Sequence, residues 1–387
     1  MIVGIIGSGA MGAGIAQVAA TNNCTVLVYD TNAEALIKAE QKLKTDLTKL
    51  VDKAKLTQAE ADAIITNTTY ATALTQFAQC DLVIEAIVEN LDVKKQVFTT
   101  LETIVSTECI LASNTSSIAI TSIAAACANA ERVVGIHFFN PATIMPLVEI
   151  IPALQTNNDI TLKSKTIIDS WGKTTVVAKD TPGFIVNRIA RPYYGEAIRI
   201  YEEGIADFAT IDWAMREYGG FKMGPFELMD FIGNDVNYKV TETVWQQFFY
   251  EPRFKPSFTQ KSLFDAKYYG RKAGRGYYNY AADAIQPEPV KNEMLAKDIF
   301  TRILCMLINE AVDALYLKIA APADIDNAMQ KGVNYPKGLL HWCNQIGAHV
   351  VLAHMNELYN TYQEDRYRPS ILLKRLAQSG ELIVISS

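Results

Sequence analysis

Histidine and cysteine are scarce in this chain of 387 residues, which contains four histidines and six cysteines. No two cysteines form a C-x-x-C pair or follow the spacing of metal ligands, so the sequence predicts no metal site. Most of the cysteines lie in apolar surroundings, which is typical of reduced core residues in a cytosolic protein. No apolar run approaches the roughly 20 residues of a membrane-spanning helix, so we expect no association with a membrane.

Positive charge is also in deficit. The chain has 36 lysines and arginines against 42 aspartates and glutamates, which argues against a nucleic acid as partner. The hydrophobic content of 49% is typical of a globular protein with a large core, and the length suggests two or three domains. Because a strand-like run begins at residue 2, no room remains for a signal or transit peptide, and we expect a cytoplasmic protein.

A glycine-rich loop is the most informative feature of the chain. The G-x-G-x-x-G sequence of residues 7–12 lies between an apolar run of strand length, residues 2–6, and a predicted helix, residues 13–20. A second apolar run, residues 25–29, ends on Asp30. A G-x-G-x-x-G match alone is a weak signal. Here a predicted strand precedes it, a predicted helix follows it, and an acidic residue ends the next strand, and together these features predict a dinucleotide-binding site.

Each residue of this motif has a physical task. Gly7 permits the tight turn, Gly9 lets the backbone approach the pyrophosphate, and Gly12 lets helix and strand pack closely. The helix N-terminus offers free N–H groups to the phosphates. Asp30 would accept hydrogen bonds from the adenosine ribose and repel a 2′-phosphate, so NAD is favoured over NADP. The alternative is a tight strand–helix turn that binds no ligand.

The first 180 residues alternate strand-like and helix-like segments, the pattern of a parallel sheet covered by helices. Pro182-Gly183 marks a boundary, and helical periodicity dominates after it. A second boundary falls within residues 281–289. Residues 33–64 resemble a helical hairpin. Further strands are predicted at residues 82–86, 110–113, 133–139, 147–151 and 174–177.

The two helical regions repeat one another at an offset of 114 residues, which indicates a duplication. We therefore predict an α/β Rossmann-type N-terminal domain (residues 1–180) followed by two tandem all-α domains (residues 181–281 and 290–387). The matched pairs include Arg188 and Arg302, Glu196 and Glu310, and Gly233 and Gly347.

His137 and Glu149 form the second candidate site. His137 is the only histidine in the first 180 residues and lies at the end of a predicted strand, where an open α/β sheet exposes ligand-facing residues. Glu149 interrupts another apolar strand and needs a partner, because an unpaired buried charge is costly. If the two strands are neighbours, Glu149 can orient the imidazole and stabilise the imidazolium of a general base. The alternative is a structural core histidine.

Small polar side chains, Ser113 to Ser117, follow another apolar strand. At a sheet edge they suit hydrogen bonds to a substrate carbonyl or hydroxyl group. The alternative is an N-cap for a helix beginning near Ile118. Both can hold, with Ser117 or Thr121 as the cap and Ser116 facing the ligand.

Taken together, these residues resemble the L-3-hydroxyacyl-CoA dehydrogenases. The resemblance covers residues 1–280, and the duplicated helical region resembles bacterial members that act on 3-hydroxybutyryl-CoA or 3-hydroxyadipyl-CoA. The motifs that carry it are Gly7 to Gln17, Glu85 to Asn90, Ser113 to Ser117, His137 to Pro141, Leu147 to Glu149, Asp180 to Arg188, Gly224 to Leu228 and Gly270 to Tyr277.

The resemblance implies a role for each matching position. His137 would be the catalytic base and Glu149 its orienting partner. Ser116 and Asn187 would hold the 3-oxygen of the substrate, and Asn140 would support the same site. The NAD-binding residues would be Gly7, Gly9, Ala10, Met11, Gly12, Asp30, Glu89, Lys94 and Asn114, with Glu89 and Lys94 on the nicotinamide side.

The sequence also departs from the common pattern of these enzymes. Pro146 stands where many members have lysine, and Asp46 stands where some have a serine that touches CoA. Lys53 is the best candidate for a CoA phosphate contact, on a helical stripe with Lys38, Lys42 and Lys49. A lysine stripe is more often a solvated face. Because Thr301 aligns with Asn187, we expect no second active site in the second helical copy.

The function implied is NAD-dependent oxidation of a short-chain (S)-3-hydroxyacyl-CoA to the 3-oxoacyl-CoA, within fatty acid metabolism. One alternative is a dehydrogenase of a free hydroxy acid, and another is a non-catalytic NAD-binding protein. In single-copy relatives the helical domain is the dimer interface, and such interfaces are self-complementary. The tandem copies are therefore expected to form a pseudo-dimer within one chain, as a monomer or a homodimer.

Overall fold

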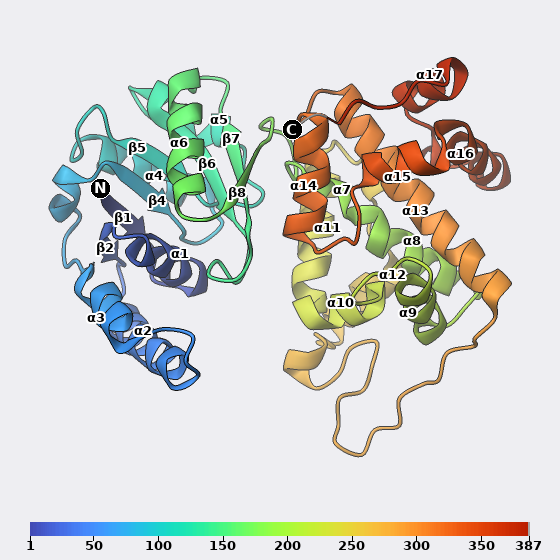
Figure 1. Cartoon of the computed structure of the whole chain (residues 1–387), viewed down its shortest axis with the longest axis horizontal. Coiled ribbons are helices and arrows are strands. Elements are labelled where there is room, and N and C mark those ends of the chain that lie inside the picture. Colours follow the sequence, from blue (N-terminus) through green and yellow to red (C-terminus); the bar gives the residue numbers. More distant parts are fainter. Residues whose placement is uncertain (386–387) are drawn as a thin grey trace. The chain divides into compact units, whose positions relative to one another are not determined.

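The computed structural model describes residues 1–385 and divides into two compact units, with the boundary between Phe184 and Ile185 (Figure 1). The first unit, coloured blue to green, is a sheet with helices on its faces, and the second, green to red, is helical. Within residues 1–385 no helix is long and apolar enough to cross a membrane.

An eight-stranded sheet forms the centre of the first unit, in the order β3-β2-β1-β4-β5-β6-β7-β8. The chain reverses its direction of travel across the sheet between β1 and β4, and this switch point is where open α/β sheets bind ligands. The strands are β1 (Ile2–Ile6), β2 (Thr25–Tyr29), β3 (Thr68–Tyr70), β4 (Leu82–Glu85), β5 (Ile110–Ser113), β6 (Val133–Phe138), β7 (Leu147–Pro152) and β8 (Thr174–Val177).

Apolar side chains hold the helices of this unit on the sheet. Ile5 and Val26 from the strands and Ile15 from the first helix are fully buried in one cluster, and such burial is the main favourable term in folding. The helices are α1 (Ala10–Thr21), α2 (Ala33–Asp52), α3 (Gln58–Thr66), α4 (Leu91–Glu102), α5 (Ile120–Ala124) and α6 (Asn158–Ser170). The expected helical hairpin is α2 with α3.

The sheet is not fully parallel, so the prediction of a parallel sheet was wrong for one pair of strands. β6 and β7 are antiparallel because only residues 139–146 connect them, too few for the helical crossover that a parallel pair requires. The short strand β3 was also missed. It has only three residues, which is below the length at which a strand pattern can be recognised.

The second unit consists of helices. Its first half holds α7 (Val186–Ile189), α8 (Arg191–Glu202), α9 (Phe208–Glu217), α10 (Pro225–Ile232), α11 (Asn234–Gln247) and α12 (Phe258–Asp265). Its second half holds α13 (Glu293–Tyr316), α14 (Pro322–Gly332), α15 (Leu339–Ile346), α16 (Ala348–Tyr362) and α17 (Ile371–Ser379). Residues 281–292 between the halves contain no helix.

The helices of the two halves recur at the offset seen in the sequence. α10 and α15 begin and end 114 residues apart, and α9 begins 114 residues before α14. Gly233 and Gly347, which precede α11 and α16, both have positive φ angles, of 106° and 95°. The sequence repeat is therefore also a repeat of structure.

Reciprocal ion pairs join the two halves where α7 and α8 pack against α13. Arg188 Nε donates to Glu310 Oε1 at 2.6 Å, and Arg302 Nε donates to Glu196 Oε1 at 2.6 Å. Since Arg302 matches Arg188 and Glu310 matches Glu196, each half presents the same arginine and glutamate to the other.

Candidate active site at the carboxyl edge of the sheet

The glycine-rich loop connects β1 to α1 with the backbone geometry that the motif requires. Gly7 has φ +99°, and a Cβ atom there would lie 2.5 Å from the carbonyl oxygen of Ala86. A Cβ on Gly12 would lie 1.9 Å from the oxygen of Gly7, whereas a Cβ on Gly9 would have nothing within 4 Å. This fold therefore leaves no room for a side chain at Gly7 or Gly12, and the open space at Gly9 fits a close-lying pyrophosphate.

The N-terminus of α1 adds backbone donors to this loop. Gly9 is its N-cap and contributes no side-chain hydrogen bond. The first amides of a helix, here those of Ala10, Met11 and Gly12, lack intrahelical acceptors and lie at the positive end of the helix dipole. They fit the phosphates of a dinucleotide.

Asp30 at the end of β2 is bonded to the glycine loop. Its Oδ2 accepts hydrogen bonds from the Ser8 amide at 2.8 Å and the Ser8 hydroxyl at 2.9 Å, and its Oδ1 accepts one from the Asn32 amide. Partial burial works to raise the pKa of Asp30, but these hydrogen bonds outweigh it and hold the pKa below its usual value. Asp30 is therefore ionised at neutral pH and carries the charge that would repel a 2′-phosphate.

Exchanging this charge should change the cofactor preference. In the Asp30→Ser, Thr31→Arg double variant, a cation replaces the carboxylate beside the ribose position, so we expect a narrower preference for NAD over NADP in kcat/KM. The single variant Thr31→Ser, which keeps the carboxylate, is the control and should retain the preference. Equal efficiency of the unmodified protein with both cofactors would show that Asp30 does not discriminate between them.

His137 on β6 and Glu149 on β7 lie opposite each other in the antiparallel pair. The distance from His137 Nδ1 to Glu149 Oε2 is 2.7 Å, and the two residues are 6% and 0% exposed. A carboxylate can only accept a hydrogen bond, so in the neutral imidazole Nδ1 is the nitrogen that carries the proton and Nε2 the one with the lone pair. The predicted contact between His137 and Glu149 is confirmed, and this tautomer is the one that a general base needs.

Two aromatic rings flank the imidazole of His137. The ring of Phe139 lies 4.6 Å from it and that of Phe184 5.9 Å, measured between centroids. They shield the His137–Glu149 pair from water, and a lower local dielectric strengthens the interaction between carboxylate and imidazole.

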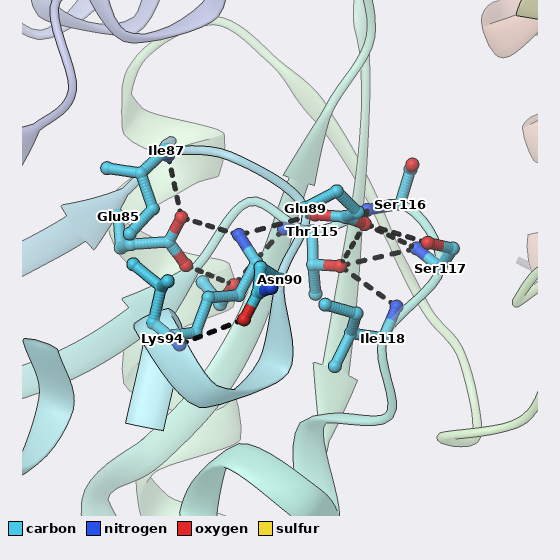
Figure 2. A network of polar contacts seen from close by, with 11 residues as sticks. Glu85, Ile87, Glu89, Asn90, Lys94, Thr115, Ser116, Ser117 and Ile118 are labelled. Atoms are coloured by element: carbon cyan, nitrogen blue, oxygen red, sulfur yellow. Dashed lines mark hydrogen bonds and ion pairs between the residues drawn. The ribbon is translucent and has the colours of Figure 1, made fainter. Parts of the chain in front are cut away.

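Glu89 organises the turn after β5 (Figure 2). Its Oε1 accepts hydrogen bonds from the hydroxyls of Thr115 and Ser117 at 2.5 and 2.8 Å, and from the amides of Ser116 and Ser117 at 3.2 Å. Burial works to raise the pKa of Glu89, but Lys94 and the two hydroxyls outweigh it and lower the pKa. The carboxylate thus fixes the backbone that carries Ser116.

Lys94 connects this turn to Glu85, a buried acid that the sequence argument missed. Lys94 Nζ lies 2.6 Å from Glu85 and 3.3 Å from Glu89, and Glu85 also accepts hydrogen bonds from the Ser113 hydroxyl and the Ile87 amide (Figure 2). The side chains of Lys94 and Glu85 are 1% and 0% exposed. Glu85 interrupts an apolar strand as Glu149 does, and that signal could have identified it.

The asparagines of the predicted site lie in three places. Asn114 Oδ1 accepts a hydrogen bond from the Phe138 amide at 2.8 Å, which ties the end of β5 to the residue after His137. Asn140 is exposed and lines a cavity of about 270 Å³ next to α1 and α2. Asn187 belongs to the second unit and is the partly exposed residue of the otherwise buried helix α7.

Lys53 follows α2 and lines a groove of about 690 Å³ within the first unit. Lys38 is not among the lining residues, while Asp46 pairs with Lys42 and Lys49. The groove is thus lined by four lysines, by Asp46 and by apolar residues, which fits a phosphorylated ligand with an organic tail. Its lining includes Lys49, Lys53, Lys55, Lys173, Ile144 and Pro146.

Lys173 supports the loop in which Pro146 stands. Its Nζ donates hydrogen bonds to the carbonyl oxygens of Ala142 and Met145, at 2.6 and 2.9 Å, and burial lowers its pKa. This lysine of the α6–β8 connection therefore fixes the course of the β6–β7 loop between His137 and Glu149.

The prediction that Ser117 or Thr121 caps the helix after the serine-rich turn was wrong. α5 begins at Ile120, and the carboxylate of Asp180 accepts hydrogen bonds from the amides of Ile120 and Thr121 at 3.0 and 2.7 Å. The helix is thus capped by Asp180, a residue 60 positions away in the sequence. The serine-rich turn is bound by Glu89 instead.

Comparison with known proteins gives matches over nearly the whole chain. Residues 2–181 match the NAD-binding domain of 3-hydroxyacyl-CoA dehydrogenase, and residues 183–280 and 299–385 match its C-terminal domain. The chain is similar to a 3-hydroxyadipyl-CoA dehydrogenase of Escherichia coli K12, with 37% identity over 98% of both chains. It is also similar to a probable 3-hydroxybutyryl-CoA dehydrogenase of Deinococcus radiodurans, with 41% identity over 72% of this chain and all of the other.

A solved structure also resembles the whole chain. The crystal structure of a 3-hydroxybutyryl-CoA dehydrogenase from Escherichia coli K12 superposes with a TM-score of 0.93 and 36% identity, and covers 98% of this chain and 99% of the other. The fold and the sequence therefore identify the same set of relatives.

Proposed function

Because this chain belongs to the 3-hydroxyacyl-CoA dehydrogenase family, we propose that it oxidises the C3 hydroxyl of a short-chain (S)-3-hydroxyacyl-CoA with NAD. The products are the 3-oxoacyl-CoA, NADH and a proton. The observation that carries the proposal is the buried His137–Glu149 pair at the sheet edge that also holds the glycine loop. The relatives named above act on 3-hydroxyadipyl-CoA and 3-hydroxybutyryl-CoA, which supports an acyl group of four to six carbons.

In this mechanism His137 is the general base. Its Nε2 takes the proton of the C3 hydroxyl, and Glu149 stabilises the imidazolium that results. NAD supplies the acceptor for the hydride from C3. Within the first unit, Ser116 donates a hydrogen bond to the 3-oxygen, with Asn140 supporting the same site, and Glu89 and Lys94 keep the Ser116 turn in place.

The basic groove of the first unit is proposed to bind the CoA moiety through Lys53. Replacing Lys53 with alanine removes a cation from the phosphate position, so KM for the CoA ester should rise several-fold while kcat changes little. Lys38→Ala, on the same helix but outside the groove, is the matched control and should leave KM unchanged. Equal KM values for both variants would remove Lys53 from the CoA site.

We also propose that residues 181–281 and 290–387 are two tandem helical domains after a nucleotide domain of residues 1–180. The recurrence of helices and the reciprocal Arg188–Glu310 and Arg302–Glu196 pairs support this division. The two copies then form a pseudo-dimer within one chain. Thr301 stands in the second copy at the position that Asn187 has in the first, so the second copy lacks the active-site asparagine. Its proposed role is to bury and support the first copy.

Two further alternatives remain distinguishable by one assay. A dehydrogenase of free hydroxy acids would oxidise 3-hydroxybutyrate rather than its CoA ester, and a non-catalytic NAD-binding protein would oxidise neither. We expect NADH formation from (S)-3-hydroxybutyryl-CoA, and little from the free acid at the same concentration. The six cysteines are all free and buried, which supports our proposal of a reducing, cytoplasmic setting for this reaction in fatty acid oxidation.

A further inference from the structure

Three charged side chains meet beside the carboxyl end of β4, and their charges do not cancel (Figure 2). Lys94 Nζ lies 2.6 Å from Glu85 Oε1 and 3.3 Å from Glu89 Oε2. Within residues 1–385 no other lysine, arginine or histidine lies within ion-pair distance of either acid. Two carboxylates thus share one ammonium group, and the cluster has one surplus negative charge.

The hydrogen bonds of the cluster fit ionised acids. Glu85 accepts from the Ile87 amide and Lys94 through Oε1, and from the Ser113 hydroxyl through Oε2. All three partners are donors, as an ionised carboxylate requires. Burial works to raise the pKa of Glu89, but Lys94 and two hydroxyl groups outweigh it, so Glu89 is ionised at neutral pH as well.

A surplus charge in this place is costly. The side chains of Glu85 and Lys94 are 0% and 1% exposed, so water screens them little, and a buried charge destabilises the fold unless it is balanced. A network that only held the turn in place would need one carboxylate for one ammonium group. The second carboxylate indicates that a cation binds next to the cluster.

The strand order shows which half of a dinucleotide would lie here. Glu85 ends β4, and its neighbours in the sheet are Ile6 at the end of β1 and Ser113 at the end of β5. The glycine loop for the pyrophosphate follows β1, and Asp30, the acceptor for the adenosine ribose, follows β2 on the other side of β1. The nicotinamide half of NAD is therefore expected on the β4–β5 side, next to the cluster.

A fixed charge acts differently on the two redox forms of this cofactor. The nicotinamide ring is a cation in oxidised NAD and neutral in NADH, so a negative charge attracts the first and has little effect on the second. The His137–Glu149 pair loses its net charge when the imidazole takes the substrate proton. The cluster of Glu85, Glu89 and Lys94 takes up no proton in the reaction, so its charge is constant.

We propose that Glu85, Glu89 and Lys94 form a fixed negative charge that strengthens the binding of oxidised NAD relative to NADH. The protein then favours the form of the cofactor that the oxidation consumes. The inference rests on the proposed function and adds selectivity for the redox state of its cofactor. Glu85 acts through its charge and through Lys94 from a fully buried position, so it is a selectivity residue and not a catalytic one.

Dissociation constants for oxidised NAD and for NADH, measured by calorimetry without substrate, test this proposal. Glu85→Gln keeps the side-chain volume and makes the cluster neutral. The ratio of the Kd for oxidised NAD to the Kd for NADH should rise about tenfold, as expected for one unit charge acting over roughly 10 Å in a partly buried site. Asp81→Asn is the matched control, since Asp81 bonds the Ile2 amide at the opposite end of β4, about 13 Å away. This control should keep the ratio.

The double variant Glu85→Gln, Lys94→Met separates charge from shape. It removes one charge of each sign, so the cluster again has one negative charge, on Glu89, and the ratio should return towards that of the unmodified protein. A ratio that rises further would attribute the effect to local geometry and overturn the proposal. If Glu85→Gln fails to fold, Glu89→Gln, at a side chain that is 39% exposed, removes the same charge and should raise the ratio to a similar extent.

The outcomes distinguish this inference from the proposed function. If the unmodified protein binds neither form of NAD, or does not oxidise (S)-3-hydroxybutyryl-CoA, the proposed function itself fails. If it does both and the ratio of the two Kd values is the same in Glu85→Gln as in the unmodified protein, the cluster does not select the redox state of the cofactor. The proposed function then stands without this inference.

Discussion

Replacing His137 with glutamine should lower kcat for the oxidation of a 3-hydroxyacyl-CoA by about 10²–10⁴, the usual worth of general acid–base catalysis. Glutamine occupies a similar volume and can still donate to Glu149, so the strand pair should stay intact. It has no lone-pair nitrogen to take the hydroxyl proton. The measurement is the initial rate of NADH formation at saturating substrate.

The affinity for NAD provides the control for this variant, because His137 is not part of the glycine loop. NAD binding to His137→Gln, measured by quenching of protein fluorescence or by calorimetry, should be close to that of the unmodified protein. Glu149→Gln should impair turnover as well, since an amide does not stabilise the imidazolium as a carboxylate does. Near-normal turnover in His137→Gln would remove this pair from the mechanism.

Replacing Glu310 with alanine should destabilise the second unit by about 3–5 kcal/mol, the cost of removing one partner from a buried ion pair. Glu310 is fully buried and accepts hydrogen bonds from Arg188 at 2.6 Å and from Arg253 at 3.0 Å. Its loss leaves two largely buried guanidinium groups with Asp313 alone. The shift in the midpoint of urea unfolding measures the effect.

Two control variants show whether the loss of stability comes from the buried contact between the two halves. Glu196→Ala removes the reciprocal acid, which is 2% exposed and bonded to Arg302, so pseudo-two-fold packing predicts a loss of similar size. Asp265→Ala breaks an exposed pair with Lys261 and should cost at most about 1 kcal/mol. If Glu310→Ala behaves like Asp265→Ala, the contact between the two halves does not hold the unit together.

The sequence was most informative where a residue's role depends on its neighbours along the chain. The tasks assigned to Gly7 and Gly12 follow from a strand–turn–helix within a few residues, and the structure shows the positive φ at Gly7 and the contact at Gly12. Glu149 could be paired with His137 because a charge in an apolar strand must find a partner. The offset of 114 residues likewise appears in the helices.

Contacts between distant residues were beyond the reach of sequence patterns. The Asp180 cap on α5 joins residues 60 positions apart, and no local signal distinguishes it from the serines nearby. The antiparallel β6–β7 pair depends on the length of one loop.

The central claim is that this chain transfers a hydride from C3 of a 3-hydroxyacyl-CoA to NAD, and isotope labelling tests it directly. With (S)-3-hydroxybutyryl-CoA deuterated at C3, the deuterium should be recovered in NADH, and the organic product should be acetoacetyl-CoA. The (R) ester should give no NADH. Deuterium that remains in the acyl group or exchanges into water, or oxidation of both stereoisomers at equal rates, would contradict the account.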